Sequence, residues 1–110
     1  PAVLKGFIDR VFLPGFAFHY HEKGPGWDKL LKGRSGEIWL MSDSPWFWYF
    51  FKYWNSPIKW LKTATLEFSG IQPVRVHVVD RVRSLTESQR ISRLESAYQS
   101  GIAAANRIDR

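Results

Sequence analysis

Two short apolar runs with a helix-like segment between them constrain the fold of this chain more than any other feature. Residues 36–41 read GEIWLM, and residues 74–79 read VRVHVV, with four valines that favour β-structure. Runs of this length and composition are typical of strands in the interior of a sheet. The segment between them begins at Ser56-Pro57, a capping residue followed by proline at a first helical position, and stops at Gly70. This order predicts two parallel strands joined by a right-handed helical crossover.

Helical patterns flank this unit on both sides. Residues 2–12 carry apolar side chains on one face, and Pro1 suits a first helical turn. Residues 86–89 read TESQ, a capping box that predicts the start of a closing helix. The helix–strand–helix–strand–helix order predicts an α/β fold. The expected apolar faces are Val3, Leu4, Phe7, Ile8 and Val11 in the first helix, Ile58, Leu61, Thr65 and Phe68 in the second, and a buried stripe of Ile91, Leu94, Tyr98, Ile102 and Ala105 in the last.

An aromatic arm and a loop separate the first helix from the first strand. Pro14-Gly15 ends the helix, and the aromatic residues at 16, 18 and 20 then alternate with Ala17, His19 and His21, which predicts an extended segment. The arm either covers a core or lines a ligand site. Four glycines and a proline in residues 21–36 predict a surface loop, with a turn of helix at residues 27–31.

Composition limits the classes of function. A chain of 110 residues is one domain or less, and the absence of cysteine excludes a disulfide framework, thiolate metal ligation and thiol catalysis. The three histidines have no metal-ligand spacing, so we expect no metal site. The net charge of +6 comes from dispersed Lys and Arg residues without a nucleic-acid motif, which favours a solvated basic surface over nucleic-acid binding.

The sequence PAVLKGFIDRVF, followed by GFAFHY, resembles the flavin-dependent NAD(P)H:quinone oxidoreductases of the flavodoxin-like fold. The family pattern is P-A-x-L-K-G-[WF]-x-[DE]-R-V-F and then G-F-A-[YF], so about ten positions match in order. The ending LEFSGI is similar to the family's L-x-F-C-G-[IF], with Ser69 in place of Cys, and the resemblance runs weakly to about Gly101.

The resemblance implies that residues 1–110 form a single partial flavodoxin-like domain, the C-terminal portion of a doubly wound parallel sheet. The runs at 36–41 and 74–79 would be the fourth and fifth strands. The N-terminal half, with its flavin phosphate-binding loop, would be absent. Residues 37–41 would then have an unpaired edge that invites association.

The resemblance also implies a flavin site, for FMN or FAD, and a quinone site. The turn after the fourth strand would border the flavin, where the family often has Thr-Thr-Gly-Gly with N–H groups that face the ring. Here the carboxylate of Asp43 would disfavour an anionic reduced flavin, and a plain helix cap is the alternative. Aromatic residues would line the acceptor pocket across a dimer interface. No side chain is identified as catalytic. His19 and Tyr49 are the candidates for a general acid. The implied residues are Ser42, Asp43, Ser44 and Pro45 for the cofactor, and Phe18, Tyr20, Trp46 and Tyr49 for the substrate.

Residues 46–54 read WFWYFFKYW, a nearly continuous aromatic run. It is far shorter than the roughly 20 apolar residues that a membrane-spanning helix needs. Three hypotheses remain: a lid over the flavin pocket, a dimer surface, or an interfacial membrane anchor of the Trp/Tyr/Lys type.

The resemblance implies an enzyme that moves hydride from NAD(P)H to flavin and electrons on to a quinone or related acceptor, and that is inactive as this fragment alone. The alternative is a non-catalytic regulatory or binding subunit of a membrane system, since some family members are ancillary subunits of potassium-efflux systems. Either protein would be cytoplasmic, possibly in peripheral contact with a membrane, and a homodimer or larger. No signal peptide is visible.

Overall fold

The centre of the molecule is a pair of parallel strands, β3 (Gly36–Met41) and β4 (Val74–Val79). The structure is a computed structural model that describes residues 1–54 and 56–108, apart from the side chains of residues 49 and 108. Gly36 lies opposite Val74 and Met41 opposite Val79, so the register pairs all six residues of each strand. Ile38, Val74 and Val79 are buried on this pair. Both predicted strands and their parallel direction are therefore confirmed.

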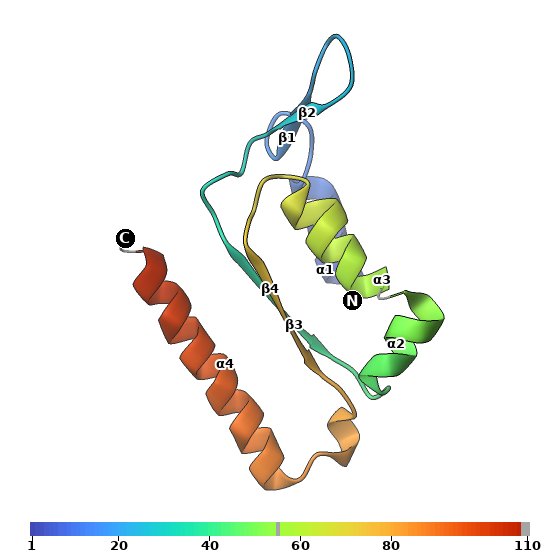
Figure 1. Cartoon of the computed structure of the whole chain (residues 1–110), viewed down its shortest axis with the longest axis vertical. Coiled ribbons are helices and arrows are strands. Elements are labelled where there is room, and N and C mark those ends of the chain that lie inside the picture. Colours follow the sequence, from blue (N-terminus) through green and yellow to red (C-terminus); the bar gives the residue numbers. More distant parts are fainter. Residues whose placement is uncertain (55, 109–110) are drawn as a thin grey trace.

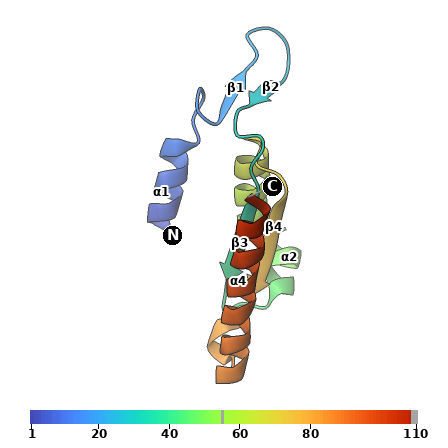
Figure 2. The same ribbon diagram turned by 90° about the vertical axis from the view of Figure 1, so that its left-hand side faces the viewer.

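Helices cover both faces of the strand pair. The long helix α4 (Glu87–Ile108) runs along one face, and the crossover segment lies on the other (Figures 1 and 2). Parallel strands need this double cover because their connections run over the faces of the sheet. The predicted α/β class follows from this layering.

The crossover from β3 to β4 consists of three consecutive helical pieces. They are α2 (Trp46–Tyr53), α3 (Ser56–Ile58) and a π-helix, η1 (Lys59–Glu67). The predicted start at Ser56 is confirmed, and Gly70 follows the end of η1 with a φ of 102°. In η1 the hydroxyl of Thr65 donates a hydrogen bond of 3.0 Å to the carbonyl of Trp60. The aromatic run at 46–54 thus belongs to the crossover and comes directly after β3.

The aromatic arm forms a small hairpin rather than an isolated extended segment. Helix α1 (Ala2–Val11) leads into β1 (Phe18–Tyr20), which pairs antiparallel with β2 (Trp27–Lys29). The expected turn of helix at 27–31 is therefore wrong. Trp27 stacks on Phe68 at 4.4 Å, and its indole N–H donates to the Phe68 carbonyl at 2.8 Å. Cross-strand pairing and this distant contact outweigh the local glycine and proline content.

Gly70 is where the hairpin meets the crossover. The N–H of Leu31 donates to the carbonyl of Ser69, which ties the chain after β2 to the end of η1. A Cβ at residue 70 would lie 3.0 Å from Lys29 Cβ and 3.1 Å from the backbone nitrogen of Lys32. Residue 70 also has a left-handed φ that glycine adopts without strain. The close approach of the two segments therefore requires glycine at this position.

Helix α4 contacts the sheet through small side chains. Ala97, Ser100 and Ala104 are partly covered along the length of the helix, at a spacing that places them on one face. The predicted buried stripe is wrong, because all five of its residues are exposed, Leu94 by 71%. The sequence pattern identified the helix, but two strands offer no surface broad enough to cover both the small residues and the neighbouring apolar stripe. The exposed residues are Ile91, Leu94, Tyr98, Ile102 and Ala105.

A polar cluster joins α4 to the strands. The Glu37 carboxylate accepts hydrogen bonds from the Ser100 hydroxyl and, at 2.8 Å, from the Trp39 indole N–H. The His77 ring stacks on Trp39 at 4.2 Å, and its Nε2 lies 3.0 Å from Glu37 Oε1, outside hydrogen-bond geometry. The hydrogen bond from Ser100 lowers the pKa of Glu37 below its ordinary value of 4.5, burial opposes this shift, and Trp39, His77 and Arg75 reinforce it. The cluster therefore favours an ionised Glu37.

The outer edge of β3 and the apolar face of α1 are both open. Among the described residues, β3 pairs with β4 alone. Figure 2 shows α1 beyond the β3 side of the pair. The side chains of Val3, Leu4 and Phe7 are exposed, Val3 by 87%, while Ile8 is buried. Exposed apolar surface of this kind is typical of an interaction site.

The lowered pKa of Glu37 predicts an acid-sensitive fold. A carboxylate with a depressed pKa stabilises the folded state above its unfolded-state pKa, and this contribution is lost as the pH falls through the folded-state value. We expect the urea midpoint of the chain to fall as the pH drops below about 4.5, and to fall less in Glu37→Gln. Glu95→Gln is the control, because Glu95 is exposed and its carboxylate accepts a hydrogen bond from Gln99 of the same helix. Parallel pH profiles for wild type and Glu37→Gln would contradict the prediction.

Candidate functional site

The turn after β3 is the first candidate site, because it lies at the carboxyl end of the parallel pair. In open α/β sheets ligands bind outside this edge. The turn is fixed to β4 by a backbone hydrogen bond from Ser42 N to Val79 O at 3.0 Å, and to the short 3-10 helix η2 (Val82–Ser84) by one from Val82 N to Ser42 O at 3.1 Å. Residues 42, 44 and 45 are half-buried, and Asp43 is exposed. The turn is thus a firmly held, accessible surface.

The Asp43 carboxylate is directed toward the chain after β4. Its Oδ1 accepts a hydrogen bond of 3.0 Å from the backbone N–H of Arg83, and its Oδ2 lies 2.8 Å from Arg83 Nε. The Arg83 side chain is 90% exposed, so solvent screens this ion pair and its stabilisation is small. The arginine nevertheless offsets the negative charge beside the turn. Arg83 lies 40 residues from Asp43 in the sequence, so no local pattern predicts this pairing.

The N–H groups of the turn are mostly engaged within the chain. Ser42 N–H bonds to β4, and Ser44 N–H donates to the Ser42 hydroxyl at 3.1 Å. Pro45 has no N–H. Among the described residues of the turn, the Asp43 N–H is the one without an acceptor. The turn therefore offers one amide donor to a ligand, rather than the row that a glycine-rich loop provides.

Helix α2 begins directly at this turn. The N–H of Trp46 donates to Asp80 Oδ2 at 3.1 Å, which places a carboxylate at the helix N-terminus, where the helix dipole favours negative charge. Asp80 is also paired with Arg81, at 3.3 Å. Trp46 is exposed beside the turn, so these two predicted parts of the site lie together. Tyr49 is the other predicted substrate residue of this segment, and its side chain is outside the part of the chain that the structure describes.

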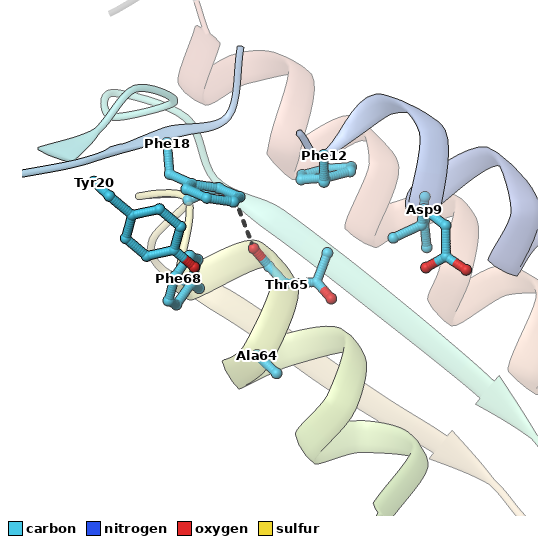
Figure 3. A pocket seen from close by; sticks show the side chains of 9 residues that line it. Asp9, Phe12, Phe18, Tyr20, Ala64, Thr65 and Phe68 are labelled. Carbon is cyan, nitrogen blue, oxygen red and sulfur yellow. Dashed lines mark hydrogen bonds between the residues drawn. The ribbon is translucent and has the colours of Figure 1, made fainter. Parts of the chain in front are cut away.

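The predicted aromatic residues of the arm line a separate cavity of about 300 Å³. Phe18 packs edge-on against Tyr20 at 5.1 Å and against Phe68 of the crossover at 5.0 Å. Figure 3 shows these three rings at one end of the cavity, and Asp9 and Phe12 of α1 at the other. The cavity reaches the lower limit of typical small-molecule pockets. Its aromatic end suits a flat ring.

The two groups of predicted residues lie at opposite ends of the strand pair. The hairpin β1–β2 joins the chain before β3, whereas the turn at 42–45 follows it (Figure 1). The six residues of β3 span about 20 Å. One chain therefore does not bring Phe18 and Tyr20 to the turn.

Other candidate chemistry is sparse. His19 is exposed on β1 opposite Asp28, remote from the turn. In the described part of the chain no group of three or more His, Cys, Asp or Glu residues could hold a metal ion. Within the same residues, no helix combines the length and apolar character that crossing a bilayer requires.

The layered α/β fold and the turn at the carboxyl ends of its parallel strands define the class of protein. A family model described as flavodoxin-like fold matches residues 1–102, and the chain therefore belongs to the flavodoxin-like fold family. Proteins of this family generally bind flavin. No curated protein matches the chain.

A solved structure supports the same assignment. The chain is similar to Smu.1420 from Streptococcus mutans UA159, whose crystal structure matches with 31% sequence identity and a TM-score of 0.72. The match covers 90% of this chain and 50% of that one. The chain thus spans about half the length of this relative.

The contact between Asp80 and α2 predicts a measurable stability effect. Replacing a capping side chain by alanine removes an acceptor from the helix N-terminus and typically costs about 1 kcal/mol. We expect Asp80→Ala to lower the free energy of unfolding by about this amount in urea titrations followed by circular dichroism. Asp80→Asn keeps an acceptor and should lose less. An unchanged midpoint in Asp80→Ala would show that the contact does not stabilise α2.

Proposed function

We propose that this chain is the C-terminal part of a flavin-dependent oxidoreductase that uses NAD(P)H to reduce a quinone or a related acceptor. The observation that carries the proposal is the turn at 42–45, held at the carboxyl edge of a parallel sheet in a flavodoxin-like chain. The motif PAVLKGFIDRVF, which resembles the pattern of the family's quinone reductases, supports this choice of activity. The cytoplasm, where NAD(P)H is available, is the proposed compartment.

The residues of the turn suit the edge of a flavin ring. Bound flavin would supply the hydride and electron chemistry, and the protein would bind and orient the reactants. The Asp43 N–H is available to a ring oxygen, and Ser42, Ser44 and Pro45 would form the wall beside it. Because Arg83 pairs with Asp43, negative charge near the ring is reduced. The exposed Trp46, together with Tyr49, would border the acceptor.

The phosphate of FMN or FAD needs a different anchor. In this fold it rests on successive N–H groups between a first strand and a first helix. We propose that further polypeptide supplies this loop and pairs with the open edge of β3. The exposed apolar faces of α1 and α4, and the half-length match to Smu.1420, support this arrangement.

A homodimer would complete the acceptor site. Phe18 and Tyr20 lie on a hairpin at the far end of the strand pair from the turn at 42–45. In a dimer with two-fold symmetry, each hairpin would approach the turn of the other protomer. The quinone would then lie between the flavin of one protomer and aromatic side chains of its partner.

A non-catalytic regulatory or binding subunit of a membrane system is the second candidate. The observation that favours it is the single available N–H group in the turn. A flavin held by one donor is positioned less firmly than one held by a glycine-rich loop. In this case the fold would serve mainly as a surface for partners.

Flavin retention separates the two functions. We expect the protein purified with the residues that precede Pro1 in its gene to carry a yellow flavin and to oxidise NAD(P)H with a quinone. The 110-residue chain alone should not reach submicromolar flavin affinity in fluorescence titrations, because it lacks the phosphate loop. A colourless, inactive longer protein that binds a partner would establish the second function. Submicromolar binding by a monomer of the short chain would contradict the partial-domain proposal.

The arm predicts a specific kinetic effect. Replacing both Phe18 and Tyr20 by alanine in the flavin-loaded protein should raise the quinone KM, since aromatic side chains stack on flat rings at low entropic cost. The KM for NAD(P)H should change less. Phe16→Ala is the matched control, because Phe16 is an exposed aromatic residue of the same arm that does not line the cavity. Unchanged quinone kinetics would assign the arm to packing alone.

A further inference from the structure

We propose that α2 and the residue after it, Trp54, form a docking surface for an anionic lipid bilayer, at the same end of the molecule as the turn at 42–45. The proposal commits to one of three hypotheses for the aromatic run. One part rests on the proposed function, namely that docking gives the site access to a quinone dissolved in the bilayer.

The first observation is the exposure of the aromatic side chains. Phe51 and Trp54 are 74% and 73% exposed, and the other described aromatic residues of the run are all exposed as well. Two pairs of rings pack within the run: Trp46 edge-on against Phe47 at 6.2 Å, and Phe50 against Phe51 at 5.2 Å. Exposed aromatic surface gathered on one short helix marks an interaction site. The described members are Trp46, Phe47, Trp48, Phe50, Phe51, Tyr53 and Trp54.

The second observation is how far these side chains extend around the helix. At 3.6 residues per turn, the positions from Tyr53 through Trp46, Phe47 and Phe51 to Trp48 cover roughly 220° of arc. A helix that packs on one protein face presents a narrower stripe. A soft bilayer interface can surround more than half of a helix. The distribution therefore favours lipid over a flat protein partner.

The third observation is charge. Residues 44–66 contain Lys52, Lys59 and Lys62 and no acidic residue. Two of these lysines lie over the exposed rings, Lys52 at 4.8 Å from Trp48 and Lys59 at 5.8 Å from Trp54. Interfacial aromatic residues with neighbouring lysines are typical of segments that bind anionic lipid surfaces.

The acidic groups nearest to α2 do not reverse this charge. Asp43 is paired with Arg83, and Asp80 is paired with Arg81. The whole chain carries a net charge of +6. Charge complementarity thus points to an anionic surface as the partner.

The length of α2 determines how it would bind. Its eight residues cannot cross a bilayer, so the helix would lie at the level of the lipid headgroups. Because α2 begins at Trp46, directly after the turn, this orientation holds the carboxyl edge of the sheet at the bilayer surface (Figure 1). A lipid-soluble quinone would reach the site from the membrane.

Vesicle flotation of the 110-residue chain tests the proposal without flavin or activity, so its outcome is independent of the proposed enzyme. We expect the chain to float with vesicles containing phosphatidylglycerol and to bind far less to phosphatidylcholine alone. The double variant Phe51→Gln, Trp54→Asn should lower binding about tenfold, since it removes the most exposed rings. Asparagine suits residue 54 because Trp54 has a left-handed φ of 53°.

Two further variants serve as controls. Leu94→Gln removes an equally exposed apolar side chain from α4 and should leave binding unchanged. The pair Lys52→Gln, Lys59→Gln should weaken binding to anionic vesicles and reduce its salt dependence, and it keeps the test decisive if the aromatic variant fails to fold by circular dichroism.

Three outcomes would overturn the proposal. The first is a wild-type chain that stays in the soluble fraction at low salt with both kinds of vesicle. The second is an equal loss of binding in Leu94→Gln, which would indicate unspecific adsorption. The third is a multimer by light scattering that the Phe51→Gln, Trp54→Asn variant converts to a monomer, without vesicle binding, which would make α2 a protein interface.

Discussion

The parallel pairing of β3 with β4 is the constraint on which the rest of the molecule depends. Two parallel strands cannot be joined by a tight turn, so the chain must cross over one face and return. The crossover then carries α2 and η1, and α4 closes the opposite face. The shared strand direction also brings Ser42, Asp43 and Asp80 to one edge. There Asp80 accepts a hydrogen bond from the start of α2, and Asp43 accepts one from the chain after β4. Position in the sheet, more than any single side chain, thus defines the candidate site.

Features that depend on nearby residues were predictable from the sequence. The strands at 36–41 and 74–79 follow from short apolar runs, and the start of α4 follows from the capping box, in which Thr86 N–H donates to Gln89 Oε1 and Gln89 N–H to the Thr86 hydroxyl. The flavodoxin-like family was predictable from the motif at the start of the chain, since PAVLKGFIDRVF is contiguous. The particular enzyme activity and the roles of the site residues stay predictions, because they require ligands and partners.

Features that depend on distant residues were not predictable. The strand at Trp27 is stabilised by the contact of its ring with Phe68, 41 positions away. The Glu37 cluster depends on a hydrogen bond from Ser100, 63 positions away. The face of α4 was misjudged for a related reason. Hydrophobic periodicity identifies the stripe that can be buried, but the amount of sheet beneath a helix decides which stripe is buried. The Arg83 partner of Asp43 lies in the short 3-10 helix Val82–Ser84, whose position beside the turn no local pattern specifies.

The orientation of the aromatic hairpin depends on Gly70, a residue with no side chain. A methyl group at this position would push against the backbone nitrogen of Lys32, so the hairpin would have to pivot away from the end of η1. Substitution here would displace Phe18, which pairs with Lys29 at this contact, and with it Tyr20 on the same strand. The position of the aromatic side chains in the arm therefore depends on a neighbouring residue that has no side chain of its own.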